Sequence, residues 1–195
     1  MKNFLNSLLN MLSALFWLLL MLSFSGLKMT FLTFLAAATH ELGHIAVLLF
    51  LKKDFSLPRA VASGFRIKTT SQSSYKEEIL ISVGGPVINL ILALFVYSVS
   101  TEFAIINLAT AFSNLLPMKD FDGYKIVSDS VALVFGCEVS ERLMPHLTVF
   151  VSSLFVFLSL FMIMFSNGGY WIFFIFFTVL IRQILFLQNN TNFED

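Results

Sequence analysis

Three residues in one segment have the types and the spacing of a metal site. His40-Glu41-Leu42-Gly43-His44 places two histidines four positions apart, which on an α-helix puts both imidazoles on one face. Two such imidazoles can bind one zinc ion, and Glu41, at the edge of that face, can act as a general base. Because zinc activates water and polarises a carbonyl, the pattern predicts a zinc-dependent enzyme that hydrolyses peptide bonds, with Glu41 catalytic and His40 and His44 as ligands.

The simpler alternative is a buried histidine pair satisfied by the backbone or by Glu41 alone. The chain has three histidines, so a chance pairing at this spacing with an adjacent glutamate is roughly a one-in-a-hundred event. The cost of ionisable groups in an apolar segment also argues against a purely structural pair. We interpret the third histidine, His146, as an interfacial residue, and the single cysteine, Cys137, as an unreactive wall residue that sets no redox compartment.

The composition is that of a membrane protein. Of 195 residues, 57% are hydrophobic and 12% are charged, and the mean hydropathy is +0.86. Soluble domains carry about 25% charged side chains, so this chain could not cover its surface with polar groups in water. The net charge is zero, which gives no indication of nucleic-acid binding. We therefore expect a lipid bilayer around the chain and no nucleic-acid partner.

The apolar runs predict an all-α polytopic membrane protein with about six transmembrane helices, since about 20 residues cross a ~30 Å hydrocarbon core. We expect the first run to be retained as an anchor. Residues 1–195 are expected to form a single membrane protease domain, with its catalytic core at about 29–135 and with helix 1 and helices 5–6 as accessory elements. The runs cover residues 5–24, 29–51, 79–99 with an interruption at Gly84-Gly85-Pro86, 101 to 114–117, 143–165 and 170–187, so that helices 5–6 fall at 143–187.

Two polar segments separate these runs. Residues 52–78 form the main loop, where Ala60 to Thr70, with a turn signal at Ser63-Gly64, predicts a short β-hairpin or re-entrant segment beside the active site. Residues 118–141 leave the membrane, and Tyr124 to Phe135 suit a short amphipathic helix on its surface. With six spans, most basic loop residues fall on one side, so the positive-inside rule predicts cytoplasmic N- and C-termini.

A third ligand is needed if zinc is to keep one position for water. The apolar pattern breaks at Pro117, and Asp120 and Asp122 follow that break. Backbone freed at such a break must be buried in protein or line a cavity. Both aspartates are therefore candidates for the third ligand.

Three segments, in this order and spacing, resemble the site-2 protease family of intramembrane zinc metalloproteases. The compact six-span layout most resembles the branch of the stage IV sporulation protein FB. The motif-bearing part covers about residues 30–130. The segments are His40-Glu41-Leu42-Gly43-His44, then Gly84-Gly85-Pro86-Val87-Ile88-Asn89, then Asn114-Leu115-Leu116-Pro117 through Asp122-Gly123.

The resemblance implies one Zn²⁺ per chain and assigns a role to each matched residue. Glu41 would be the general base, and the substrate would be a membrane-bound or membrane-associated protein cleaved by regulated intramembrane proteolysis. Independently of the resemblance, we expect an edge of the Ala60 to Thr70 segment to hold the unwound substrate by strand pairing. The implied metal ligands are His40, His44 and Asp122, and the implied substrate-binding residues are Asn89, Asn114, Gly85 and Pro86.

Other readings stay open at this point. The Gly84-Gly85-Pro86 segment is also typical of a simple helix kink. A metal transporter or sensor would use histidines at mid-membrane, although we find no paired repeats of the kind that transporters show. An inactive membrane scaffold of the same fold is a further alternative, and the intact Glu41 argues against it.

Overall fold

The computed structural model describes residues 2–53, 59–61, 64–66, 73–119 and 121–166. Contacts divide the chain into two compact units, one ending at Ser113 and one beginning at Asn114, and we describe each unit by itself. The single domain expected from the sequence stays a prediction. In chain order the elements are α1 (Lys2–Phe50), β1 (Arg59–Val61), β2 (Gly64–Arg66), α2 (Tyr75–Val96), α3 (Thr101–Asn114), α4 (Asp122–Phe135) and α5 (Cys137–Ser166).

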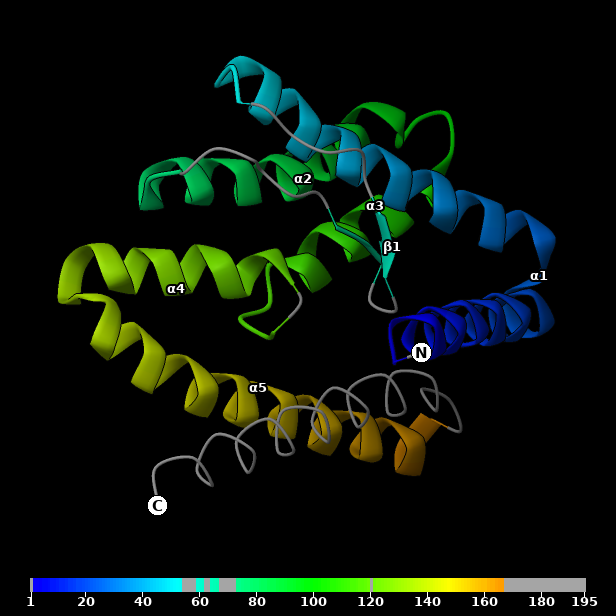
Figure 1. The fold of residues 1–195 in the computed structure, drawn as a ribbon. Helices are drawn as coiled ribbons and strands as arrows, with labels where there is room; N and C mark the ends of the chain where they lie inside the picture. The colour runs from blue at the N-terminus through cyan, green and yellow to red at the C-terminus, as the bar shows by residue number, and fades with distance from the viewer. Residues whose placement is uncertain (1, 54–58, 62–63, 67–72, 120, 167–195) are drawn as a thin grey trace. The chain divides into compact units, whose positions relative to one another are not determined.

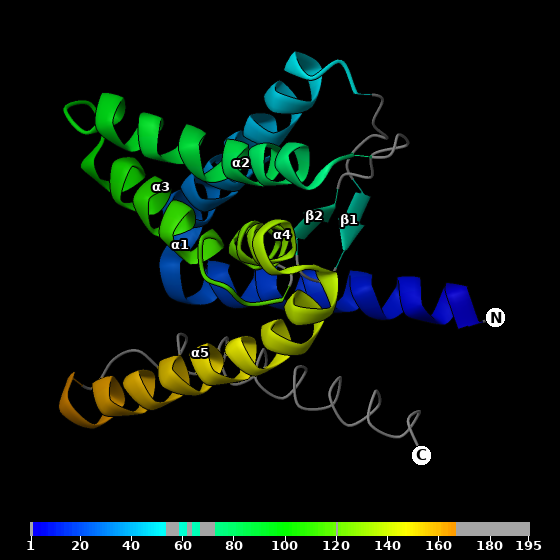
Figure 2. The ribbon, with the colours of Figure 1, turned by 90° about the vertical axis from the view of Figure 1, so that its left-hand side faces the viewer.

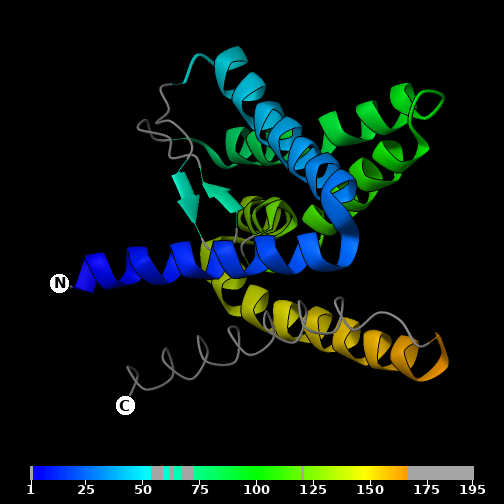
Figure 3. The same ribbon diagram turned by 90° about the vertical axis from the view of Figure 1, so that its right-hand side faces the viewer.

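Helix α1 consists of two helical parts that meet at Gly26. This glycine has φ 74° and ψ 169°, a conformation that residues with a Cβ rarely adopt. Figure 3 shows the sharp turn within α1 that results. The gap between the two predicted runs, 5–24 and 29–51, falls at this turn, and the part from Ser25 to Phe50 is long and apolar enough to cross a membrane.

Helix α2 runs without a break through Gly84-Gly85-Pro86, so the prediction that these residues interrupt it is wrong. Pro86 cannot donate to the carbonyl four residues earlier, but close packing against α1 compensates. A Cβ on Gly84 would lie 2.7 Å from the carbonyl oxygen of Gly43, and a Cβ on Gly43 would collide with the carbonyl of Gly84. The two helices therefore cross backbone against backbone, as small residues allow in membranes (Figure 1).

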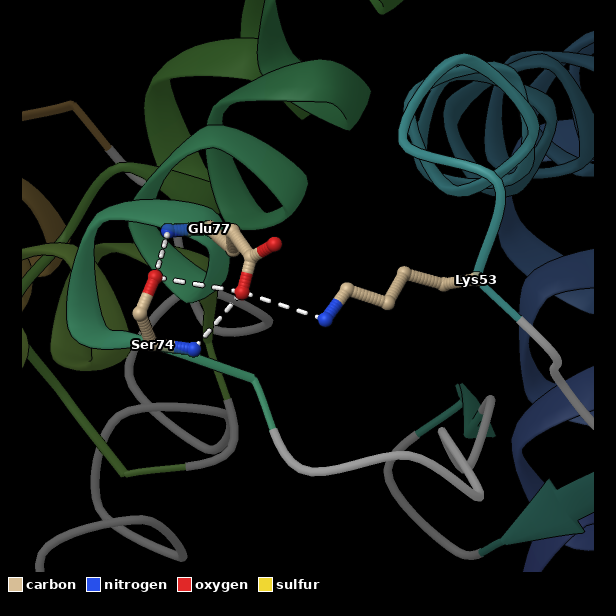
Figure 4. Close-up of polar contacts among 3 residues, drawn as sticks. All are labelled: Lys53, Ser74 and Glu77. Atoms are coloured by element: carbon tan, nitrogen blue, oxygen red, sulfur yellow. Dashed lines mark hydrogen bonds and ion pairs between the residues drawn. The ribbon is translucent and has the colours of Figure 1, made fainter.

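A capping box fixes the start of α2 (Figure 4). The hydroxyl of Ser74 accepts from the backbone N–H of Glu77 at 3.4 Å, and the Glu77 carboxylate accepts from the backbone N–H of Ser74 at 2.7 Å. Lys53, just after α1, places its Nζ 3.1 Å from the same carboxylate oxygen. The two backbone donors are satisfied reciprocally, and the ion pair ties the end of α1 to the start of α2.

A second ion pair marks the opposite end of this unit. Lys28, near the start of the second part of α1, pairs with Glu102 at the start of α3, with 2.5 Å between Nζ and Oε2. His40 lies twelve residues after Lys28 and thirteen before Lys53, which is about 18 and 20 Å along an ideal helix. The first histidine of the pair is therefore near the middle of its helix, midway between two charged ends.

The described residues contain three helical segments long and apolar enough to cross a membrane, Ser25–Phe50, Tyr75–Val96 and Cys137–Phe161. Large apolar side chains cover their outer faces; Leu94, for example, is 80% exposed, which suits lipid contact. The chain is thus a membrane protein, but six spans are not shown. Helix α3 has 14 residues, about 21 Å, which is shorter than the ~30 Å hydrocarbon core.

The other expected spans and the topology remain predictions. The run at 5–24 lies in the first part of α1, and the run at 170–187 falls outside the described residues. The sides on which the two termini lie are not determined by the helices, so their cytoplasmic placement also stays a prediction.

In the first unit, β1 and β2 form a two-stranded antiparallel pair in which Ala60 faces Phe65 and Val61 faces Gly64. Apart from Arg59, these strands fall in the Ala60 to Thr70 segment predicted as a short hairpin or re-entrant segment, which stays a prediction. Residues 62–63, between the strands, and residues 67–72 lie outside the described part of the chain. The placement of the pair beside the active site stays a prediction.

The second unit contains α4 and α5, which meet at a corner (Figure 2). Gly136, with φ 94°, separates them, and the hydroxyl of Ser140 donates to the carbonyl of Ser128 across the corner at 2.8 Å. Helix α4 covers the stretch predicted as an amphipathic helix. Helix α5 begins at Cys137, six residues before the apolar run at 143, because an apolar pattern marks the part of a helix that suits lipid and not the point where helical hydrogen bonding starts.

Candidate metal centre

The second part of α1 brings His40 and His44 together. Their Nε2 atoms lie 3.2 Å apart, and the rings meet edge to face with centroids 4.8 Å apart and planes at 86°. The two residues are only 5% and 9% exposed. The four-residue spacing thus produces the shared face that helix geometry predicts.

Hydrogen bonds fix which nitrogen of each ring carries the proton. His44 Nδ1 lies 2.8 Å from the carbonyl oxygen of Ile81 on α2, and a carbonyl only accepts, so Nδ1 donates; in the neutral ring the lone pair is then on Nε2. His40 Nδ1 lies 2.7 Å from Oδ1 of Asn89, while the amide nitrogen of Asn89 donates to the carbonyl of Ala36 at 3.1 Å. That orientation makes Asn89 Oδ1 the acceptor, so His40 also donates from Nδ1, and the Nε2 atoms of the two rings face each other.

The nitrogen pair fits a zinc ion. A tetrahedral zinc site with Zn–N bonds of about 2.05 Å holds its nitrogens about 3.3 Å apart, and the two Nε2 atoms are separated by 3.2 Å. Metal-bound histidines typically donate their other ring N–H to a carbonyl or a comparable acceptor, as both rings do here. The first unit therefore brings together two nitrogen atoms at a separation that suits zinc, and each ring already has a hydrogen bond at its other nitrogen.

Gly85 forms the wall against which both rings lie. A Cβ at this position would be 2.5 Å from His44 Nε2 and 2.7 Å from His40 Nε2, so any side chain would occupy the space of the nitrogens. The next residue, Pro86, is fully buried. This packing explains why a glycine faces the histidines. The contact of Gly85 and Pro86 with a substrate stays a prediction.

Asn89 was predicted to contact the substrate, but its polar atoms are already used inside the first unit. It is 0% exposed, its oxygen accepts from His40, and its nitrogen donates to Ala36 and to Oδ1 of Asn107. A substrate carbonyl would have to displace one of these partners. Glu41 follows His40 on α1 and is partly buried, and its role as general base stays a prediction.

In the second unit, Asp122 is the first residue of α4. Gly123 follows, and a Cβ there would collide with the carbonyl of Leu115, so only glycine lets this turn pack against the start of α4. The carbonyl of Pro117 in the same turn accepts from the hydroxyl of Thr148 at 3.3 Å. This packing holds Asp122 at a defined place on the unit. Asn114 is the last residue of α3, whereas Asp120 lies outside the described residues.

Two participants in the histidine hydrogen bonds were not predicted. Asn107 on α3 is 0% exposed. The sequence could have indicated it, because it is a polar residue on the same helical face as the buried Ala104 and Ala111. The carbonyl of Ile81 left no signal, because every residue has such a carbonyl.

Comparisons with known proteins bear on the fold. No protein-family model and no curated protein matches the chain. Among solved structures, the chain is similar to a site-2 protease from Methanocaldococcus jannaschii, with a TM-score of 0.58 and 18% sequence identity over 90% of this chain and 86% of that chain. The stage IV sporulation protein FB branch stays a prediction. At this identity the likeness concerns the fold, and the chain has the fold of that site-2 protease.

Proposed function

We propose that the chain is an intramembrane zinc metalloendopeptidase of the site-2 type, which cleaves a membrane-bound or membrane-associated protein. The observation that carries the proposal is the pair of histidine Nε2 atoms 3.2 Å apart in the middle of an apolar helix. Ionisable groups at such a depth are expensive and point to function. The fold shared with a site-2 protease supports the same conclusion.

The proposed metal ligands are His40 and His44 of the first unit and Asp122 of the second, the set that the family resemblance implies. Two imidazoles and one carboxylate are a donor set of zinc hydrolases, and they leave a fourth position open. Zinc bound there, one ion per chain, would supply a Lewis acid that activates water and a peptide carbonyl.

The chain's own groups perform the remaining steps. Glu41 takes the proton from the attacking water and delivers it to the leaving amine. A substrate helix must unwind first, because its carbonyls are held in internal hydrogen bonds. The backbone edge of β1 and β2 binds the unwound segment by strand pairing, and Asn114, with Gly85 and Pro86, contacts its backbone.

The first test measures zinc in the purified chain in lipid nanodiscs by mass spectrometry. We expect one zinc per wild-type chain, one per Glu41→Gln chain, and none for His40→Ala. The matched control is His146→Ala, which removes the third histidine. Its Nδ1 contacts the carbonyl of Arg142 in its own helix, at 2.8 Å, so this variant should keep its zinc.

The second test identifies proteolysis. Membrane proteomes of cells that produce the wild type or Glu41→Gln are compared, and we expect a protein whose full-length form accumulates with the variant. Identical proteomes together with zinc-free wild-type protein would refute the proposal. Zinc flux into vesicles that contain the purified chain would instead support a transporter.

A further inference from the structure

We propose that Asn107 of α3 is a positioning residue that acts through Asn89 of α2 to hold His40 of α1 in its metal-binding tautomer. The inference rests on the proposed function, since it assumes that His40 binds zinc. It concerns a residue outside the three motifs that suggested the metal site. It also gives Asn89 a different role from contact with the substrate.

The first step is that main-chain carbonyls orient both amides. Asn107 Nδ2 donates to the carbonyl of Phe103 at 2.8 Å, and Asn89 Nδ2 donates to the carbonyl of Ala36 at 3.1 Å. Carbonyl oxygens only accept, so each amide must point its nitrogen at its carbonyl. Asn107 Oδ1 then faces Asn89 Nδ2 at 2.7 Å, and Asn89 Oδ1 faces His40 Nδ1 at 2.7 Å.

The second step is that burial removes the alternatives. Asn89 and Asn107 are both 0% exposed, and a buried amide group without a partner costs its full desolvation energy. Turning the Asn89 amide by 180° would place its oxygen against two acceptors, the carbonyl of Ala36 and Oδ1 of Asn107. The chain of hydrogen bonds from α3 to α1 therefore has one favourable direction.

The third step is the difference between the two histidines. His44 donates to a main-chain carbonyl, that of Ile81, which cannot turn into a donor. His40 donates to a side-chain amide, which presents either an oxygen or a nitrogen depending on its orientation. Two acceptors hold that amide in its orientation, the carbonyl of Ala36 and Oδ1 of Asn107, and Asn107 supplies the shorter of the two contacts and the one that a side-chain substitution can remove.

The test compares two substitutions of Asn107. Asn107→Leu has a similar size but no acceptor for Asn89, and we expect about tenfold weaker zinc binding, the lower end of the effect of outer hydrogen-bond partners on metal sites. Asn107→Asp keeps an oxygen towards Asn89 in either protonation state, so it should bind zinc nearly as well as the wild type. The control is Ser82→Ala, which removes a buried α2 hydroxyl that has no hydrogen-bond partner within the described residues.

Two readouts are independent of proteolysis. Competition between the purified protein and a chromophoric chelator for Zn²⁺ gives the affinity. Nitrogen-15 NMR of the metal-free protein, labelled at its three histidines, gives the tautomer of each ring. We expect Asn107→Leu to produce a tautomer mixture at His40 and to leave His44 protonated at Nδ1, so His44 serves as a control within the same molecule.

The outcomes separate this inference from the proposed function. Wild-type zinc binding with unchanged affinity and an unchanged His40 tautomer in Asn107→Leu would overturn the positioning role alone. A wild type without zinc would overturn the proposed function, and the His40 tautomer would still decide the positioning role. If Asn107→Leu does not fold, Asn107→Asp decides, because a large loss of zinc affinity in that variant contradicts the acceptor role.

Discussion

Replacing Gly85 with alanine adds one methyl group at the most sensitive point of the candidate metal centre. The new Cβ would lie 2.5 Å from His44 Nε2, and an ordinary contact needs at least 3.4 Å, so the ring or the helix must yield by 0.9 Å. Metal sites tolerate deviations of only about 0.2 Å in ligand distances. The required shift is several times that tolerance.

We therefore expect Gly85→Ala to bind zinc at least about 100-fold more weakly than the wild type. This loss of affinity equals or exceeds the largest losses that follow from substituting the hydrogen-bond partners of metal ligands. The metal-free protein should still fold, because the atoms that must move are the ends of two side chains. Their displacement breaks the hydrogen bonds of Nδ1 to Ile81 and Asn89, at about 1 kcal/mol each.

The assay pairs zinc competition with thermal unfolding of the metal-free protein in detergent. Gly43→Ala is the contrast, because its Cβ would meet the backbone of Gly84 and not a side-chain end. This variant should lose thermal stability through separation of α1 and α2. Wild-type zinc affinity in Gly85→Ala, or an equal loss of stability in both variants, would refute the reasoning.

Three further predictions follow from contacts described above. Asp122→Asn should weaken zinc binding about tenfold or more in the same competition assay, because a neutral amide oxygen is a poorer ligand than a carboxylate; unchanged binding would exclude Asp122 as the third ligand. Ser74→Ala should lower the free energy of unfolding in SDS titrations by about 1 kcal/mol through loss of the N-cap. Lys28→Met should change it by less than about 1 kcal/mol, because its ion pair with Glu102 is exposed, and a larger loss would contradict that estimate.

The histidine pair was predictable from the sequence because helix geometry alone determines it. Residues four apart share a face on any α-helix, and the length and apolar composition of the 26-residue segment Ser25–Phe50 predict a helix. The resulting convergence of His40 and His44 needed no knowledge of other elements. The roles assigned to Glu41 and Asp122 needed the family resemblance as well, and they remain to be tested.

The contacts between helices were not predictable in the same way. Gly84-Gly85-Pro86 indicated a break because local preference disfavours glycine and proline inside a helix. In the structure, packing against Gly43 and the two imidazoles outweighs that preference. Likewise, the sequence identifies Asn107 only as a polar residue in an apolar run. Its contact with Asn89 depends on how α2 and α3 pack together, and the order of residues along the chain does not specify that packing.

The contact between Gly43 and Gly84 has a mechanical consequence. Packed helices slide past one another through small adjustments of the side chains that lie between them. Where two backbones touch directly, no side chains lie between the helices to adjust their rotamers, and close packing resists even small displacements. The histidines on α1 and their wall at Gly85 on α2 therefore belong to one stiff frame, and under the proposed function a motion that admits a substrate would take place in elements outside this helix pair.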